Sequence, residues 1–359
     1  MISAGSLFKR QPAPMIGLDI SASAIKMVEL SQNSQGGWVL ERCTSEPLEN
    51  EWVVDGNIEK FDELADAVKR LIKKSGSKAK DVAMALPHSA VITKKIILPG
   101  NLSDQELEVQ VESEASQYIP FPLEEVSLDF CVIGPNSRNP DDVDVLLAAT
   151  RKERVEERNN LAVLIGLNPV VMDVESHASR LAAGRLIENL PKSEDGALIA
   201  LIKVGARNAT LQVLRNDEVL HDSEQGCGGA QLTQMIMRHY GFTLEEAELK
   251  KRSGDLPTDY VDAVLQPFVS GLAQDIGRAL QFFFTSTPYH SVQHILLFGG
   301  SAGVEGLAQA VQAQTGVDTQ VLNPFEGMKL SSNIHQSKIK SSAPLYLTAC
   351  GLAMRRFLK

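Results

Sequence analysis

The sequence lacks the cysteine patterns of metal-binding and disulfide-stabilised proteins. Its four cysteines form no CxxC pair and no cluster with histidine: Cys43, Cys131, Cys227 and Cys350. Isolated cysteines of this kind are typical of reduced thiols in the core of a cytoplasmic protein, and we expect that role for all four.

Long hydrophobic runs and basic stretches are also missing. No segment approaches the roughly 18 consecutive apolar residues of a transmembrane helix. The opening MISAGSLFKRQPAP is too poor in apolar residues for a secretion signal. The formal net charge is −10, so no basic stripe is available to neutralise nucleic-acid phosphates. We therefore expect a chain that neither spans a membrane nor binds nucleic acid.

Several catalytic motifs are absent as well. The sequence contains neither the GxxxxGK[ST] of a P-loop nor the GxGxxG of a dinucleotide fold, and no Ser-x-Gly elbow with acid and histidine partners. The histidines are scattered, and His290 and His294 resemble a loop coincidence more than a metal site. With 359 residues, of which 43% are apolar, the chain can still bury the cores of two to four domains.

The first half alternates strands and helices. Apolar alternation predicts strands at 16–20, 25–30 and 37–43, and an apolar face at helical spacing predicts a helix at 61–74. The block 84–166 follows the pattern β-α-β-β-α, and a capping box of Ser103 and Glu106 opens its first helix. We expect this block to be a small inserted domain.

The second half begins by repeating the first. At an offset of 184 residues, Ile20 aligns with Val204 and Ile25 with Ala209. Each segment is an apolar strand, a tip of small residues and a second apolar strand, so internal duplication is the simplest explanation, although two unrelated hairpins remain an alternative. Residues 229–284 are mostly helical, with breaks expected at Gly241, at SGDLP and at Pro267. The strand HILLFGG is expected to run directly into a helix at SAGVEGLAQAVQAQTG, and PLYLTACGLAMRRF predicts a last helix.

The two hairpin tips and the GG strand suit a phosphate site. Small residues let backbone N–H groups approach an anion, and Asp19 beside Ser21–Ser23 could hold Mg²⁺ that bridges to phosphates. The tip 205–210 could cradle the same phosphates from the other side, and FGGSAG at 298–303 offers bare backbone. The competing interpretation is that Asp19 only forms the turn and binds no ligand.

These motifs together resemble the actin/Hsp70/sugar-kinase ATPase superfamily and, within it, the PilM family of type IV pilus assembly proteins. The resemblance covers nearly the whole chain, and its most specific stretches are GLDISASAIKMVEL, SEASQYIPFPLEEVSLDF, DVDVLLAATRKE, VVMDVESHASRLA, LQPFVSGLAQDIGRALQFFF and LFGGSAGVEGLA.

The resemblance implies an α/β fold of the actin-like, ribonuclease-H-like duplicated type, as in the cell-division protein FtsA, with an inserted β-α-β-β-α subdomain. It implies four subdomains. The first actin-like subdomain would comprise 15–83 and 167–195, the partner-binding insert 84–166, the second actin-like subdomain 196–225 and 291–359, and a helical subdomain 226–290.

The resemblance also implies ATP and Mg²⁺ as cofactors and assigns the site by motif. Asp19, which would also hold the metal, belongs to the first phosphate segment with Ser21, Ser23 and Lys26. The second phosphate segment contributes Lys203, Gly205, Ala206 and Thr210, and the adenosine segment Gly299, Gly300 and Ser301. Glu248 and Lys251 of AELKK would contact ribose and base, and Asp173 and Glu175 would position the attacking water.

The function implied is that of a cytoplasmic adaptor held at the inner membrane by its partners. It would receive the cytoplasmic amino-terminal tail of PilN in a groove between the first subdomain and the insert. It would also contact the assembly motor ATPases and other platform proteins, and it could form homo-oligomers. Two alternatives stay open at this point: an FtsA-like, filament-forming, membrane-associated ATPase, and a small-molecule kinase of the same superfamily.

One residue departs from the superfamily pattern. The second phosphate segment usually begins with Asp-Ile-Gly, whereas this chain has Lys203-Val204-Gly205. An ammonium can neutralise a phosphate oxygen directly but is a poor base for activating water. We therefore expect nucleotide binding with slow hydrolysis at most.

Overall fold

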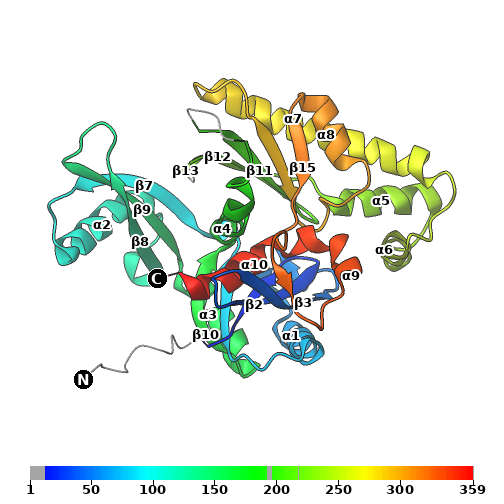
Figure 1. The fold of residues 1–359 in the computed structure, drawn as a ribbon, viewed down its shortest axis with the longest axis horizontal. Coiled ribbons are helices and arrows are strands. Elements are labelled where there is room, and N and C mark those ends of the chain that lie inside the picture. The colour runs from blue at the N-terminus through cyan, green and yellow to red at the C-terminus, as the bar shows by residue number, and fades with distance from the viewer. Residues whose placement is uncertain (1–12, 192–195, 217, 359) are drawn as a thin grey trace.

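The computed structural model describes residues 13–191, 196–216 and 218–358. Two mixed β-sheets form the two halves of the molecule, as Figure 1 shows. A three-stranded insert lies on one side, and a group of helices lies beside the second sheet. The expected boundary at 195/196 adjoins residues 192–195, which lie outside the described part of the chain.

The first sheet has the order β10-β6-β1-β2-β3-β16. Its hairpin pairs Ile20 with Ile25, at the facing ends of the two strands that apolar alternation predicts. Helix α1 (Phe61–Ser75) covers the sheet with an apolar face and ends at Gly76 in the left-handed conformation. The strands are β1 (Met15–Ile20), β2 (Ala24–Gln32), β3 (Trp38–Pro47), β6 (Asp81–Leu86), β10 (Asn168–Val174) and β16 (Lys329–Leu330), and a small ribbon joins β4 (Val53–Val54) to β5 (Asn57–Ile58).

The second sheet repeats this arrangement in the order β13-β12-β11-β14-β15. Its hairpin pairs Val204 with Ala209, which matches Ile20 and Ile25 at the offset of 184. In both halves the first hairpin strand also pairs in parallel with a later strand. The two hairpins are therefore equivalent in position. The strands are β11 (Leu198–Val204), β12 (Ala209–Arg215), β13 (Glu218–Gln225), β14 (His294–Phe298) and β15 (Asp318–Val321).

The insert has the expected β-α-β-β-α order and a sheet of its own. Strand β9 (Asp142–Arg151) lies between β7 (Ile92–Pro99) and β8 (Val126–Pro135). Helix α2 (Asp104–Tyr118) begins with the expected capping box of Ser103 and Glu106 and buries Leu107, Val111 and Ala115. Helix α3 (Lys152–Leu164) instead carries Leu161 and Ala162 into the core of the first half. Because β6 belongs to the first sheet, the insert's own sheet begins only at Ile92.

Two expectations about helices, the break at Pro267 and the start of the helix after β14, are wrong. Helix α5 (Gly229–Tyr240) ends at Gly241, and α6 (Leu244–Ser253) ends at the first residue of the expected SGDLP loop. Pro267 does not break a helix: α7 (Gln266–Ser286) carries it in its first turn, where its missing N–H is tolerated, and a π-helical turn at Val261–Leu265 precedes it. Helix α8 (Leu307–Thr315) begins well after the GG pair, because turns fill 299–306 and Gly306 takes a left-handed conformation.

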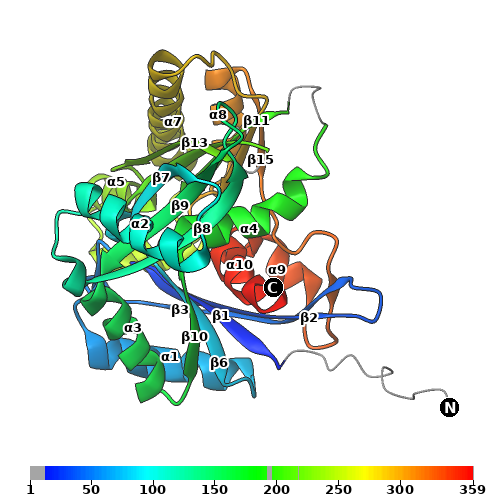
Figure 2. The ribbon, with the colours of Figure 1, turned by 90° about the vertical axis from the view of Figure 1, so that its left-hand side faces the viewer.

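The carboxyl-terminal segment returns to the first half, as Figure 2 shows for α10. Strand β16 pairs with β3, and helix α10 (Leu347–Met354) packs on α4 (Glu175–Ile187) and β1. A Cβ on Gly351 would lie 1.7 Å from the Ala178 carbonyl oxygen. A short helix, α9 (Gln336–Lys340), precedes it.

The cysteines deviate from the expectation at one position. Cys227 and Cys350 are buried and Cys43 is partly buried, but Cys131 is exposed on β8. Alternation along an edge strand of the insert turns this residue away from the face that α2 covers.

Candidate functional site

The first hairpin tip holds a buried ion pair. Lys26 Nζ lies 2.9 Å from Asp19 Oδ2 and donates to Ser21 Oγ at 2.6 Å. Asp19 and Lys26 are cross-strand partners in the hairpin, and they are 4% and 3% exposed. The Ser21 N–H donates to the Ala24 carbonyl to close the turn, and the Ser23 carbonyl accepts from Leu48. The acid at this tip is therefore neutralised by a lysine from its own hairpin.

The second tip places a lysine where the first has its acid. Lys203 is the penultimate residue of β11, and its ammonium forms an ion pair with Glu175 at the start of α4, across the cleft between the halves. Burial lowers the pKa of Lys203 to about 8, against the opposing electrostatic effect of Asp19. The two tips therefore form one electrostatic cluster.

Glycines bring two further segments together behind the second tip. Gly205 N–H closes the turn on the Asn208 carbonyl, and the Gly205 carbonyl accepts from Gly229 N–H at 3.0 Å and Ser301 Oγ at 2.9 Å. Ala230 N–H donates to the Ala206 carbonyl at 2.7 Å. The second phosphate segment and the adenosine segment thus meet at the start of α5.

Gly229 and Gly299 are packed too closely to carry a side chain. A Cβ on Gly229 would lie 2.2 Å from Ser301 Oγ, and one on Gly299, at φ +99°, would lie 2.6 Å from the Val204 carbonyl. Sequence reasoning missed Gly228 and Gly229, although the run GCGGA before a helix was the available signal. Gly300 lies in the turn after β14, where a Cβ would touch Leu345 at 3.4 Å.

The predicted ribose and base residues lie on α6 and contact Thr233, which is one helical turn after Gly229 on α5. Lys251 Nζ donates to Glu248 Oε1 at 2.6 Å and to Thr233 Oγ1 at 2.5 Å, and Thr233 also bonds to the Glu248 carboxylate. Burial raises the pKa of Glu248, but the hydrogen bonds from Lys251 and Thr233 outweigh it, so the pKa lies below its usual value. Thr233 Oγ1 contacts the Gly229 carbonyl at 3.5 Å, which connects this triad to the glycine cluster.

The two predicted water-positioning acids have different surroundings. Glu175 faces Lys203 in the cleft. Asp173 accepts from Arg355 through both carboxylate oxygens, at 2.5 and 2.9 Å, and from the Val174 N–H at 2.7 Å. A water-positioning role for Asp173 stays a prediction that would require Arg355 to move away.

Little free space lies between the halves at this point. A cavity of about 20 Å³ is lined by Glu175, Lys203, Thr210 and neighbouring residues, which is room for about one water molecule. Beside it, His88 Nε2 lies 3.4 Å from Asp222 Oδ1 on β13. Phosphates can enter only if the halves separate or these side chains rearrange.

Comparison with known proteins identifies the family. The family model described as "Type IV pilus assembly protein PilM" matches residues 17–357. This chain belongs to the PilM family. A solved structure titled "PilM-PilN type IV pilus biogenesis complex" is 30% identical, with a TM-score of 0.80, and the match covers 96% of this chain and 99% of that one.

Two more distant structures establish the fold class of this PilM-family chain. The ethanolamine utilization protein EutJ from Carboxydothermus hydrogenoformans is 15% identical, with a TM-score of 0.57 and coverage of 97% of this chain and 90% of that one. MreB 5 of Spiroplasma citri, solved with AMPPNP, is 13% identical, with a TM-score of 0.50 and coverage of 94% of each chain. The fold is that of the actin-like ATPases, as the sequence predicted.

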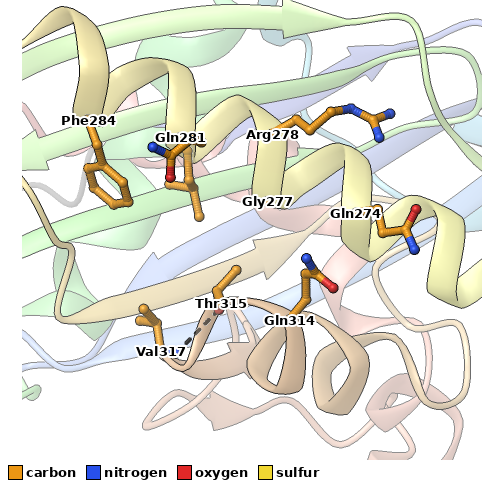
Figure 3. Close-up of a pocket in the computed structure, with 9 residues that line it drawn as sticks. Gln274, Gly277, Arg278, Gln281, Phe284, Gln314, Thr315 and Val317 are labelled. Carbon is orange, nitrogen blue, oxygen red and sulfur yellow. Dashed lines mark hydrogen bonds between the residues drawn. The ribbon is translucent and has the colours of Figure 1, made fainter.

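A wider groove in the PilM-family chain lies elsewhere, between α7 and α8 (Figure 3). It has a volume of about 400 Å³ and is lined by the amides of Gln274, Gln281 and Gln314 together with Arg278 and Phe284. No carboxylate, imidazole or thiol lines it, so it offers no group for acid–base catalysis.

The residues do not fit the Mg²⁺ site that the superfamily implies. Mg²⁺ prefers carboxylate and water oxygens, whereas Asp19 is paired with Lys26 and lies in the electrostatic field of Lys203. Within the described ranges, no group of three or more His, Cys, Asp or Glu side chains could hold a metal ion. None of the helices in that part of the chain has the length and apolar composition needed to cross a bilayer.

Proposed function

We propose that this PilM-family chain is an adaptor on the cytoplasmic side of the type IV pilus platform that binds the amino-terminal tail of PilN through its insert. The observation that carries the proposal is the similarity, over nearly the whole chain, to a protein solved in a PilM–PilN complex. The four subdomains, the contacts with motor ATPases and homo-oligomer formation belong to the same proposal. The chain would be held at the inner membrane by PilN.

The insert has the surface that an extended peptide needs. Its strands β7 and β8 each pair on one side only, so both leave an open backbone edge. Apolar side chains are exposed on these edges, with Ile97 56% and Val132 48% exposed. An edge strand with exposed apolar residues favours addition of a peptide strand whose alternate side chains are apolar.

Peptide binding to the full chain tests this assignment. We expect Ile97→Asp or Val132→Asp to weaken binding of a fluorescent PilN tail peptide by at least about tenfold, because a carboxylate would be desolvated at the interface. Leu249→Asp, on an exposed position of α6 outside the insert, is the matched control. If both insert variants bind like the wild type, the insert is not the tail site.

We further propose that the cleft binds ATP and hydrolyses it slowly. Support comes from the convergence of both hairpin tips, the glycine cluster and the Thr233–Glu248–Lys251 triad around one cleft. We expect slow turnover because Asp173 is held by Arg355 and because a lysine, which is a poor base, stands at residue 203 where the superfamily has an acid. Calorimetry with ATP measures binding, and steady-state turnover at about one per second or faster would contradict the slow rate.

The same preparation separates the two alternatives, which family membership does not favour. A small-molecule kinase would transfer phosphate to a panel of sugars or to acetate. An FtsA-like filament former would sediment with ATP and lipid vesicles. We expect neither result from this chain alone.

A further inference from the structure

We propose that Lys203 takes the place of the divalent cation, so that this chain binds nucleotide polyphosphate through its own ammonium groups and without Mg²⁺. This inference rests on the proposed nucleotide binding and specifies its chemistry. It concerns this chain's departure from the superfamily pattern at residue 203.

The duplication shows which residue of the first tip corresponds to Lys203. At the offset of 184, Asp19 corresponds to Lys203, and its cross-strand partner Lys26 corresponds to Thr210. The first tip therefore carries an acid with its own lysine, and the second carries a lysine opposite a neutral threonine. Two opposed acids could share a divalent cation between them, but an acid and a lysine already balance one another.

The ion pairs show where the positive charge of the second tip is directed. Lys203 has no acid opposite it in its hairpin, and it reaches across the cleft to Glu175 on the other half. Its side chain is 22% exposed and that of Glu175 is 18% exposed, and a phosphate could reach this ammonium once the halves separate or these side chains rearrange. The buried Asp19 carboxylate is paired with the Lys26 ammonium at 2.9 Å. A metal ion would therefore have to displace this ammonium to bind the carboxylate.

An ammonium is well suited to this position. It is a compact point charge with three donors on a flexible stem, and it can exchange a carboxylate oxygen for phosphate oxygens without leaving its strand. Polyphosphate entering the cleft would replace Glu175 as the partner of Lys203. Lys26, held by Asp19 and Ser21, would supply the second cation from the opposite tip.

The test is ATP affinity of the full chain by calorimetry, with Mg²⁺ and with EDTA. We expect the wild-type affinities in the two conditions to agree within about threefold. Lys203→Met should lose at least about tenfold in both conditions, because the phosphate loses a charged partner. Lys203→Asp should bind ATP only when Mg²⁺ is present, and Lys80→Met, at an exposed position in the first half, is the control.

The outcomes are distinguishable. Wild-type binding that EDTA abolishes would overturn the inference while leaving nucleotide binding itself in place, and so would a Lys203→Met variant of unchanged affinity. Wild-type protein that binds ATP in neither condition would overturn the proposed nucleotide function, and this inference with it. Circular dichroism and tail-peptide binding establish that each variant is folded.

Discussion

Replacing Arg355 with methionine is expected to destabilise the fold. Arg355 binds Asp173 through two hydrogen bonds, and the Asp173 side chain is 6% exposed against 28% for Arg355. Removing one partner of a buried pair costs about 3–5 kcal/mol because the other charge is left uncompensated. Because Arg355 is partly in water, screening reduces this cost, and we expect a loss of about 2–3 kcal/mol in the free energy of unfolding.

The double variant Asp173→Asn, Arg355→Met supplies the control. Asparagine keeps an acceptor for the Val174 N–H, which lies 2.7 Å from Asp173 Oδ1, and removes the unpaired charge. It should therefore recover more than half of the lost stability. Urea unfolding followed by circular dichroism measures all three proteins. Unchanged stability of Arg355→Met, together with lost ATP turnover in Asp173→Asn, would refute this reasoning and favour a water-positioning Asp173.

Two further predictions concern packing and pH. Gly351→Ala should lower the free energy of unfolding by about 3 kcal/mol or more, because its Cβ would overlap the Ala178 carbonyl on α4. The control Gly184→Ala has open space around its Cβ and should be neutral or stabilising. Equal thermal midpoints for the two variants would contradict the packing. Burial lowers the pKa of His177 from 6.5 to about 4, with a smaller contribution from Arg180. The folded state thus resists protonation, so stability should fall as the pH drops from 6.5 towards about 4. His177→Gln should reduce the difference in urea midpoint between about pH 7 and pH 5 by the equivalent of about 1–2 kcal/mol, and an unchanged difference would exclude His177 as its source.

The hairpins, the insert and most helices could be predicted because their signals are local. Alternation predicted the strands at 16–20 and 25–30, and the Ser103–Glu106 capping box placed the start of α2. The start of α8 was misplaced because Gly303 and Gly306 favour turns over helix, a competition that apolar periodicity does not register.

The side-chain partners at the site could not be predicted from local patterns. Asp173 and Arg355 are 182 positions apart, and Glu175 meets Lys203 only because the two halves face each other. Sequence patterns identified Lys203 as unusual without indicating its partner. The convergence of Gly205, Gly229 and Ser301 likewise depends on three segments that only the tertiary fold brings together.

The return of α10 to the first sheet has a consequence for biosynthesis. Strands β1 to β3 leave the ribosome before the later strands. The helix that packs against β1 and β2 comprises residues 347–354 and is synthesised after every described strand. The nascent first half therefore keeps an apolar surface uncovered until residues 347–354 have been made, which exposes it to aggregation. The sheet of the insert, whose three strands and α2 lie within residues 92–151, can by contrast form as soon as its own segment has emerged.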